Sequence, residues 1–403
     1  MSTTETAIVI GGGIAGPVTA TALRKAGIAA RVYEAYPGPT YGIGSGLALA
    51  PNGVAALDIV GAGDLIREIA SPVSHMEMSV GGKTLHMPEL VDVPSLKLVD
   101  RNDLHRTLHD HAVAAGVPFE YNKRLVRVDE DIDGITAHFA DGSTATADVL
   151  IGADGIRSTV RGLIDPNNPG PEYTGMIGFG AMIENDDLGL PPETMVFAFG
   201  KKAYYLYGTV EGNKIMWGAN LPHKEYLSLT EARAIPAEHW VQILRETYAE
   251  DTPGGEFARR TTAENLETTG ALHIMPPVPH WYRGRMVLVG DSVHAPSNSS
   301  GQGASLAIES AVQLARCLRD LPDHTAAFAA YEGLRRPRVE SVAARARKIN
   351  HSKTPGPVAR KMMSLLMPLL IKGMNPEKTM GAEQRYRIEW DAPVQQELAA
   401  STA

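Results

Sequence analysis

The sequence Gly11-Gly12-Gly13-Ile14-Ala15-Gly16 decides the fold of this chain. It follows a short apolar run at residues 7–10 and opens a helical pattern at residues 14–26, which stops at Gly27 before a second apolar run at residues 30–33. Runs of this kind indicate a strand, a helix and a second strand. The connection is too long for a hairpin and suits a right-handed crossover, so the chain is predicted to begin with a parallel βαβ unit.

The glycines match the pattern G-x-G-x-x-G, which predicts a dinucleotide site at this strand–helix junction. Residues without a Cβ let the backbone approach a pyrophosphate, and the start of the helix offers free N–H groups and a partial positive charge. Glu34 ends the second strand, 34 − 16 = 18 positions after Gly16, about where an acid binds ribose hydroxyls. An isolated glycine motif could be a tight turn only. The complete unit favours dinucleotide binding but does not distinguish FAD from NAD.

Two later segments place acids at strand ends. Asp154 lies in residues 152–161 (GADGIRSTVR), and Asp291 lies in residues 290–296 (GDSVHAP). Each of these segments follows a buried strand. Ligands of an open parallel sheet bind at this edge, where carboxylates can bind sugar or ribityl hydroxyls. Either segment alone could be a capping turn.

Together these segments resemble the single-component, class A FAD-dependent aromatic hydroxylases, which are similar in plan to p-hydroxybenzoate hydroxylase. GGGIAG with Glu34, GADGIRSTVR and GDSVHAPSNSSGQGAS carry the resemblance, with weaker support from LALAPNG, from VDRNDLHRTL with Arg101, and from YEGLRRPRV. It covers most of the chain. It implies an α/β protein with a Rossmann-like FAD-binding domain, a mixed or antiparallel β-sheet substrate domain and C-terminal helices.

The resemblance also implies a set of FAD contacts. They are the backbone around Gly11, Gly13, Ala15 and Gly16 for the pyrophosphate, Glu34 and Ala35 at the adenosine end, Arg101 at the phosphates or ribityl chain, Leu125 beside the adenine, Asp291 at the ribityl or pyrophosphate region, and Gly303 and Ala304 at the pyrimidine edge of the flavin. Pro296 would lie beside the reacting ring. Asp154 and Arg157 would help to organise FAD and a transiently bound NAD(P)H.

Two positions depart from the pattern of many relatives. Ala35 stands where they have a basic residue, which predicts a weaker electrostatic hold on the adenosine end. Ser292 and Val293 stand where they have two alanines, a change that leaves Asp291 available.

The implied activity is that of a monooxygenase that uses NAD(P)H and O2 to hydroxylate a small aromatic, phenolic or polycyclic substrate through a flavin C4a-hydroperoxide. The alternatives are another FAD oxidoreductase on the same scaffold, such as a halogenase or a prenyl reductase, and a flavin-binding module without turnover. The WxWxIP segment expected of a halogenase is missing from the sequence.

Residues 1–172 and 270–350 are predicted to form the FAD-binding domain, with a small β-meander at about 122–147. Residues 173–269 are predicted to form the substrate-binding sheet, and residues 351–403 a C-terminal helical segment with a frayed tail after about Ala392. Phe197 and Phe199 share one strand face, and Ala203, Tyr205 and Tyr207 share a face of another. The pocket candidates are Tyr205, Tyr207, Trp217 and Pro296. The aromatic residues could equally be core residues, and no catalytic base can be named.

His105, His109 and His111 are predicted to lie on a solvated helix surface, because no nearby acid completes a metal site. His294 is assigned a structural role, and Cys317 is expected to be a buried, unreactive thiol.

The composition excludes several classes of partner. Lys and Arg total 38 against 46 Asp and Glu, a net charge of −8 that argues against binding of nucleic acid or anionic lipid. A single cysteine indicates a reducing, cytoplasmic compartment. The apolar stretch at residues 362–371 is interrupted by Pro368 and is about half of the ~20 residues that span a bilayer, so it is expected to be a packed C-terminal helix. We expect a monomer or a homodimer.

Overall fold

The computed structural model describes residues 4–39, 46–351, 362, 365–367, 370–371, 373 and 375–401. The chain opens with strand β1 (Thr6–Ile10), helix α1 (Ala15–Lys25) and strand β2 (Ala29–Tyr33). The two strands pair in parallel from Thr6↔Ala29 to Ile10↔Tyr33. This confirms the predicted βαβ unit.

The first strand lies inside a six-stranded sheet of order β18-β19-β12-β1-β2-β8. Its further strands are β8 (Phe119–Glu120), β12 (Val149–Gly152), β18 (Tyr282–Arg283) and β19 (Met286–Leu288). Strand β12 pairs in parallel with both β1 and β19, so strands that are distant in sequence end at the same edge. The expected Rossmann-like organisation is confirmed.

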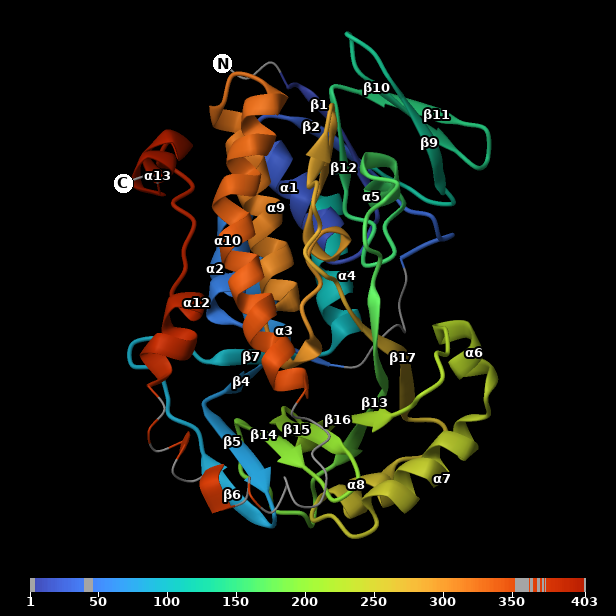
Figure 1. Ribbon diagram of the computed structural model, residues 1–403, viewed down its shortest axis with the longest axis vertical. Coiled ribbons are helices and arrows are strands. Elements are labelled where there is room, and N and C mark those ends of the chain that lie inside the picture. The colour runs from blue at the N-terminus through green and yellow to red at the C-terminus, as the bar shows by residue number, and fades with distance from the viewer. Residues whose placement is uncertain are drawn as a thin grey trace.

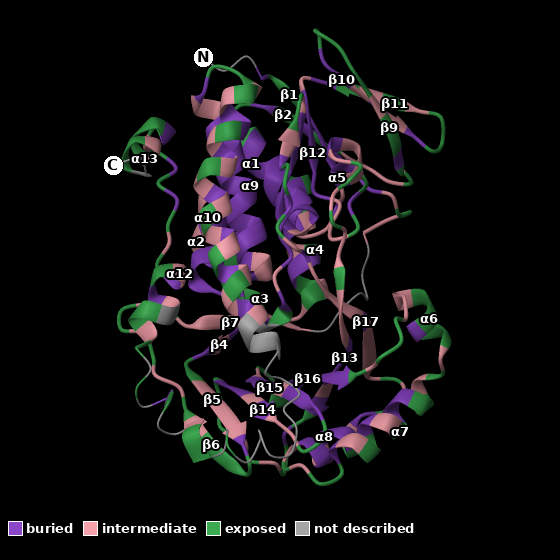
Figure 2. Ribbon diagram, viewed as in Figure 1, coloured by how far each residue is buried: buried purple, intermediate pink, exposed green. Residues whose placement is uncertain are grey.

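Helices cover this sheet, and the longest lie side by side (Figure 1). They are α2 (Pro51–Ile59), α3 (Gly63–Ile69), α4 (Arg101–Ala114), α5 (Thr159–Ile164), α9 (Gly303–Asp320) and α10 (His324–His351). Figure 2 shows α9 buried over most of its length. Glu309 of α9 forms ion pairs with two residues of α10, Arg335 at 2.6 Å and Arg338 at 2.8 Å. Because Glu309 and Arg335 are both fully buried, these pairs fix the position of α10 on α9.

A seven-stranded sheet forms the lower part of Figure 1 and has the order β17-β13-β16-β15-β14-β5-β6. Its strands are β5 (His75–Val80), β6 (Lys83–His86), β13 (Glu172–Glu184), β14 (Thr194–Phe199), β15 (Tyr204–Val210), β16 (Lys214–Pro222) and β17 (Leu266–Ile274). All neighbours are antiparallel except β5 and β14. The helices that follow β16 are α6 (Leu229–Ala234), α7 (Ala237–Tyr248) and α8 (Gly254–Arg260).

The domain boundaries stay a prediction, but the strand pairing bears on them. The β5–β6 hairpin comes from the range 1–172, yet it pairs into the seven-stranded sheet. Strand β17 crosses the proposed boundary at residues 269–270. A short sheet of β3 (Leu47–Leu49), β4 (Ser71–Val73) and β7 (Leu96–Val99) lies between the two larger sheets.

The predicted meander is present as β9 (Leu125–Glu130), β10 (Ile135–Phe139) and β11 (Thr144–Ala147). The prediction of a frayed tail after Ala392 is wrong, because α13 (Val394–Ser401) is a helix, and its Glu397 pairs with the buried Arg316 of α9. A short π-helical turn (Glu377–Gly381) and α12 (Ala382–Gln384) precede it. In the apolar stretch at 362–371, residues 363, 364, 368 and 369 lie outside the described residues, and the described ones are helical. The predicted packing of this helix is not found among them, because Met362, Leu365, Leu366 and Leu370 are exposed.

Candidate active site

The glycine turn after β1 forms a cradle with little side-chain bulk. Gly11 has φ +102°, and a Cβ on it would lie 2.5 Å from the carbonyl oxygen of Ala153 at the end of β12. A Cβ on Gly16 would overlap the carbonyl oxygen of Gly11, so helix and strand pack as closely as predicted. At Gly13, by contrast, no described atom lies within 4 Å of an added Cβ. The turn is therefore closely packed at Gly11 and Gly16 and open at Gly13.

Glu34 and His105 hold the turn through its backbone. Glu34 accepts a hydrogen bond from Gly12 N at 2.7 Å and a second from Tyr36 N at 3.0 Å. His105 Nε2 lies 2.6 Å from Gly12 O, and because a carbonyl only accepts, the imidazole must donate there. Burial lowers the pKa of His105, which favours the neutral ring. The prediction that His105 lies on a solvated surface is therefore wrong.

Asp154 caps a helix. Its carboxylate accepts hydrogen bonds from Ser158 Oγ at 2.5 Å, Thr159 N at 2.7 Å and Val160 N at 3.1 Å at the start of α5. This supports the capping alternative for the second segment. Asp154 thus fixes the position of this loop.

Arg161, in the same segment, ties the second motif to the third. Its buried guanidinium donates to Ser292 O and Ile156 O, both at 2.8 Å, and to Asn168 Oδ1 at 2.9 Å. This role of Arg161 was not predicted from the sequence. A basic residue three positions after a helix N-cap is ordinary in sequence, and only the fold reveals that the third motif lies beside it.

The third motif lies between α1 and α9. Gly290 has φ +67°, and a Cβ on it would lie 3.1 Å from the Cβ atoms of both Ala15 and Ala307. Asp291, the next residue, is half-buried, and this burial raises the pKa of its carboxyl, while the guanidinium of Arg101 acts to lower it. Arg101 is exposed at the start of α4, as a cation that contacts a phosphate would be.

Helix α9 begins at Gly303, where no described atom lies within 4 Å of an added Cβ. Its N-cap residue, Gln302, makes no side-chain capping bond and instead accepts from Asn52 Nδ2 at 3.0 Å. The first turn, with Gly303 and Ala304, therefore keeps free N–H groups for an anionic group. Asn52 belongs to the LALAPNG segment and also donates to Glu309, which links α2 to the same helix.

The remaining predicted contacts lie around these groups. Leu125 is buried at the start of β9, and Ala35 and Pro296 are half-buried. The guanidinium of Arg124 lies 6.0 Å from the ring centroid of Tyr36, one residue past Ala35. A basic side chain thus stands near the adenosine end even though position 35 lacks one.

The face of the seven-stranded sheet toward the six-stranded sheet is identified by its contacts. A Cβ on Gly208 of β15 would lie 2.6 Å from Leu98 of β7, and a Cβ on Gly46 would overlap the sulfur of Met216. Met195, Leu98 and Met216 also share one hydrophobic cluster with Val73 of β4.

Tyr205, Tyr207 and Trp217 lie on the opposite face. They are buried in a second cluster with Tyr248 of α7 and Phe257 of α8. Their prediction as pocket residues is therefore wrong, and the core alternative is correct. Because successive side chains of a strand point to opposite faces, the predicted pocket residues are one position away from the residues that point inward. Leu206 pairs with Phe197, and Tyr204 pairs with Phe199, so these residues line the inward face instead.

One titratable side chain on the inward face is unusual. Glu267 of β17 pairs with Gly180 of β13, whose neighbours Phe179 and Ala181 point to the helix-covered side. Glu267 therefore points inward. Burial, together with nearby Asp100, raises its pKa to about 7. No sequence pattern marks this residue, since its environment comes from two distant segments.

The solvated surface predicted for His109 and His111 is not found, because both residues are half-buried. His109 donates or accepts at Tyr121 OH at 2.6 Å, and His111 contacts Val60 O at 2.8 Å. Within the described residues, no group of His, Cys, Asp or Glu side chains could hold a metal ion. Cys317 is buried, and burial raises the pKa of its thiol, as expected of an unreactive cysteine.

These features fit FAD. The open front of the glycine turn offers room for a pyrophosphate, and the free start of α9 offers N–H groups for an anionic ring edge. The side chains of Arg101 and Asp291 offer groups for phosphates and sugar hydroxyls. Their convergence follows from the parallel order of β1, β12 and β19, whose carboxyl ends share one edge.

Known proteins resemble the chain along most of its length. Residues 3–346 match a family model described as FAD binding domain. The chain is 30% identical over 359 residues to the FAD-dependent urate hydroxylase of Klebsiella pneumoniae, covering 86% of this chain and 91% of that protein. It is 31% identical over 370 residues to the 6-hydroxynicotinate 3-monooxygenase of Bordetella bronchiseptica, with 86% and 90% covered.

A solved structure agrees with these matches. The structure of Klebsiella pneumoniae HpxO complexed with FAD and uric acid superposes with a TM-score of 0.82 and 26% identity, covering 94% of this chain and 95% of that chain. The chain therefore shares both the family and the fold of these flavoproteins.

Proposed function

This chain belongs to the FAD binding domain family of FAD-dependent hydroxylases, and from that premise we propose that it hydroxylates a small, flat aromatic ring that carries a hydroxyl group or a ring nitrogen. It is an FAD-dependent monooxygenase, an oxidoreductase. The named relatives act on urate and 6-hydroxynicotinate, both nitrogen heterocycles. A substrate of that chemistry is the best-supported choice for this chain.

One observation carries the proposal: the glycine turn, Asp291 and the free start of α9 lie together at one sheet edge, with Arg101 near enough to act on Asp291, and the inward face of the second sheet is apolar. When bound, FAD supplies the oxygen-activating chemistry that amino-acid side chains lack. We propose that Gly13, Ala15 and Gly16 hold its pyrophosphate, that Arg101 and Asp291 hold its phosphates or sugar hydroxyls, and that Gly303 and Ala304 face its pyrimidine edge.

The chain's own contribution is binding, orientation and the exclusion of water. The positive end of α9 stabilises negative charge next to it. Phe197, Phe199, Tyr204 and Leu206 on the inward sheet face present an apolar wall that suits a flat ring. Glu267 lies on the same face and is the carboxyl that we propose to accept the proton of a ring hydroxyl.

We propose that NAD(P)H binds transiently near Arg157. This guanidinium is exposed, hydrogen-bonds to Tyr226 OH and lies 6.0 Å from the centroid of that ring. An exposed cation beside an aromatic ring suits a phosphate-bearing, stacking ligand. The proposal includes a cytoplasmic location and a monomer or homodimer. Within the described part of the chain, every helix is too short or too polar to cross a bilayer.

The test is spectroscopic and chemical. The purified protein should be yellow and retain FAD, NAD(P)H should bleach the flavin without oxygen, and air should restore it. Hydroxylated benzoates and pyridines should accelerate NAD(P)H oxidation, and mass spectrometry should detect one added oxygen atom. Bleaching without oxygen insertion into any of these rings would favour another FAD oxidoreductase, and a flavin that NAD(P)H never bleaches would favour a non-catalytic binding module.

A further inference from the structure

The start of helix α2 packs closely against the first turn of α9. Ala50 N, at the N-cap of α2, donates to Ser305 Oγ at 3.0 Å. A Cβ on Gly53 would lie 2.6 Å from the same hydroxyl oxygen. Asn52 lies between these two positions and is only 1% exposed. Residues 50–53, from the LALAPNG segment, therefore fix the place where α9 begins.

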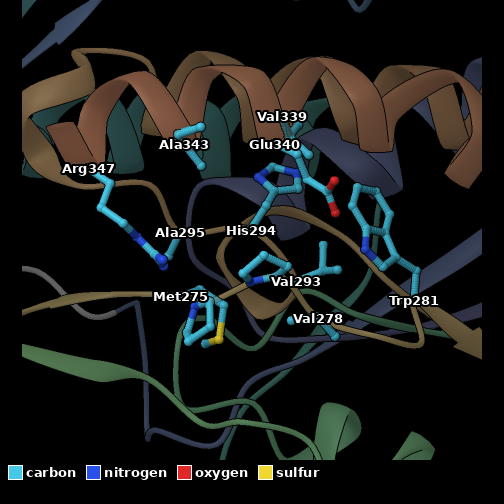
Figure 3. Close-up of a pocket in the computed structure, with 13 residues that line it drawn as sticks. Met275, Val278, Trp281, Val293, His294, Ala295, Val339, Glu340, Ala343 and Arg347 are labelled. Carbon is cyan, nitrogen blue, oxygen red and sulfur yellow. The ribbon is translucent and has the colours of Figure 1, made fainter.

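Helix α10 packs less closely beside the third motif. A cavity of about 390 Å³ lies between residues 293–295 of that motif and Val339 and Ala343 of α10 (Figure 3). The ion pairs of α10 to α9 are made farther along, at Glu309 in the second turn. Helix α10 thus holds the second turn of α9, whereas α2 holds the first.

The side-chain amide of Asn52 donates to two acceptors on α9. Its Nδ2 lies 3.0 Å from Gln302 Oε1 and 2.6 Å from Glu309 Oε1. Burial acts to raise the pKa of Glu309, but the guanidinium of Arg335 outweighs burial and lowers it, so the carboxylate is ionised. Because a carboxylate only accepts, Asn52 must present its NH2 group here, and Gln302 must then present its oxygen.

The other amide atom of Asn52 indicates which of these contacts matters. Its Oδ1 is buried and has no hydrogen-bond partner among the described residues. A buried acceptor without a partner costs about 1–3 kcal/mol, which an apolar side chain of similar volume would avoid. Glu309 already has two guanidinium partners. The contact that favours an asparagine at this position is therefore the one to Gln302.

Gln302 occupies the N-cap position of α9, and its side chain makes no capping bond. A side-chain oxygen at an N-cap can accept from N–H groups of the first helical turn. These are the groups that we assign to the pyrimidine edge of FAD, which gains negative charge when the flavin is reduced. If Gln302 Oε1 turned onto them, it would compete with the flavin. The hydrogen bond from Asn52 holds this oxygen elsewhere.

We propose that Asn52 is a positioning residue: by holding Gln302 Oε1, it keeps the N–H groups at the start of α9 free for the pyrimidine edge of reduced FAD. This inference rests on the proposed function, because it requires FAD at that place. Asn52 acts through Gln302 and not by contact with the substrate. Loss of its NH2 group should therefore weaken the binding of reduced FAD more than that of oxidised FAD.

The test is a double-mutant cycle of Asn52→Leu and Gln302→Met, measured as the two-electron reduction potential of the bound flavin. Leucine removes the NH2 donor, and methionine keeps a side chain of similar length without the oxygen. We expect Asn52→Leu to weaken reduced FAD relative to oxidised FAD about 3- to 10-fold, which lowers the potential by about 15–30 mV. In the Gln302→Met background, the same substitution should leave the potential unchanged, because no amide oxygen remains to compete.

Stability measurements separate this effect from packing. Asn52→Leu also removes a donor from Glu309, so urea denaturation should show a loss of stability in both backgrounds. Ser341→Ala, at an exposed position of α10, is the control and should change neither stability nor potential. Asn52→Ala removes the same donor and replaces Asn52→Leu in the cycle if the leucine variant does not fold.

An equal fall of the potential in both backgrounds, or no fall in either, would overturn the inference. A wild-type protein that retains no FAD would refute the proposed function and this inference together. A wild-type protein that binds FAD, with a potential that does not depend on Asn52, would refute this inference alone.

Discussion

The hydroxyl group of Ser292 lies 2.6 Å from the carbonyl oxygen of Gly152 and donates to it across the ends of β19 and β12. The hydroxyl oxygen of Ser292 in turn accepts a hydrogen bond from Val289 N at 3.1 Å. Ser292 is fully buried, and its own carbonyl accepts from Arg161. Ser292 stands where many relatives have an alanine, and its hydrogen bonds join the second motif to the third.

We therefore expect Ser292→Ala to lower the free energy of unfolding by about 1–2 kcal/mol, because a buried hydrogen bond is lost. Urea denaturation of the FAD-free and FAD-loaded forms measures this. Ser341→Ala, on the exposed face of α10, is the control and should change stability little. Equal stability of the Ser292→Ala and Ser341→Ala variants would show that the hydrogen bond contributes nothing.

Substitutions at two glycines of the first motif should have different effects, one on stability and one on FAD binding. Gly16→Ala introduces a methyl group that overlaps Gly11 O, so it should destabilise the FAD-free protein by about 3 kcal/mol. Gly13→Ala meets no described atom within 4 Å, so the FAD-free protein should stay as stable as the wild type. Because the added methyl group occupies the proposed pyrophosphate position, FAD binding should weaken by about 10-fold or more, a loss of about 1.4 kcal/mol.

Thermal unfolding and fluorescence titration with FAD measure these two effects. Wild-type FAD affinity in Gly13→Ala would mean that the cofactor does not approach this turn. A stable, FAD-free Gly16→Ala protein would contradict the close packing of α1 on β1.

Glu267 should make stability depend on pH. Its folded pKa is raised to about 7 from the ordinary value of 4.5, so the folded state holds the proton more tightly than the unfolded state. Its contribution is fully present below pH 4.5 and is lost as the pH rises to about 7. Glu267→Gln should therefore gain stability relative to the wild type as the pH rises through this window.

Urea denaturation between pH 4.5 and pH 8 tests this, with Glu264→Gln as the control on an exposed position of the same segment. A constant difference in unfolding free energy between Glu267→Gln and the wild type across this range would show that Glu267 titrates normally.

The two faces of β15 should respond differently to substitution. Tyr207→Ala removes a buried ring that packs on Phe257 at a centroid distance of 4.9 Å, so it should cost about 3–5 kcal/mol of stability. Leu206→Trp enlarges a side chain on the inward face, so it should lower kcat/KM for the aromatic substrate by about 10-fold or more, with little change in stability.

Denaturation and steady-state NAD(P)H oxidation, measured on both variants, show which face of β15 lines the substrate pocket. If Tyr207→Ala impaired substrate turnover at unchanged stability, the inward assignment of Leu206 would be wrong.

The sequence by itself determined the βαβ opening, the FAD family and the strand ends that carry the three motifs. These features depend on local rules: Gly11, Gly13 and Gly16 must lack side chains at this turn, and strands, turns and helices follow each other at fixed spacing. The meander was likewise predictable from periodicity and turn residues.

Only the tertiary structure decided which face of the second sheet points inward. Tyr205 and Leu206 are adjacent in sequence, and a strand with apolar residues on both faces does not reveal which set meets the helices and which meets the other sheet. His105, Arg161 and Glu267 depend on partners that are distant along the chain: Gly12, Ser292 and Asp100. Their burial, and hence their hydrogen bonds and pKa values, exists only once those segments pack together.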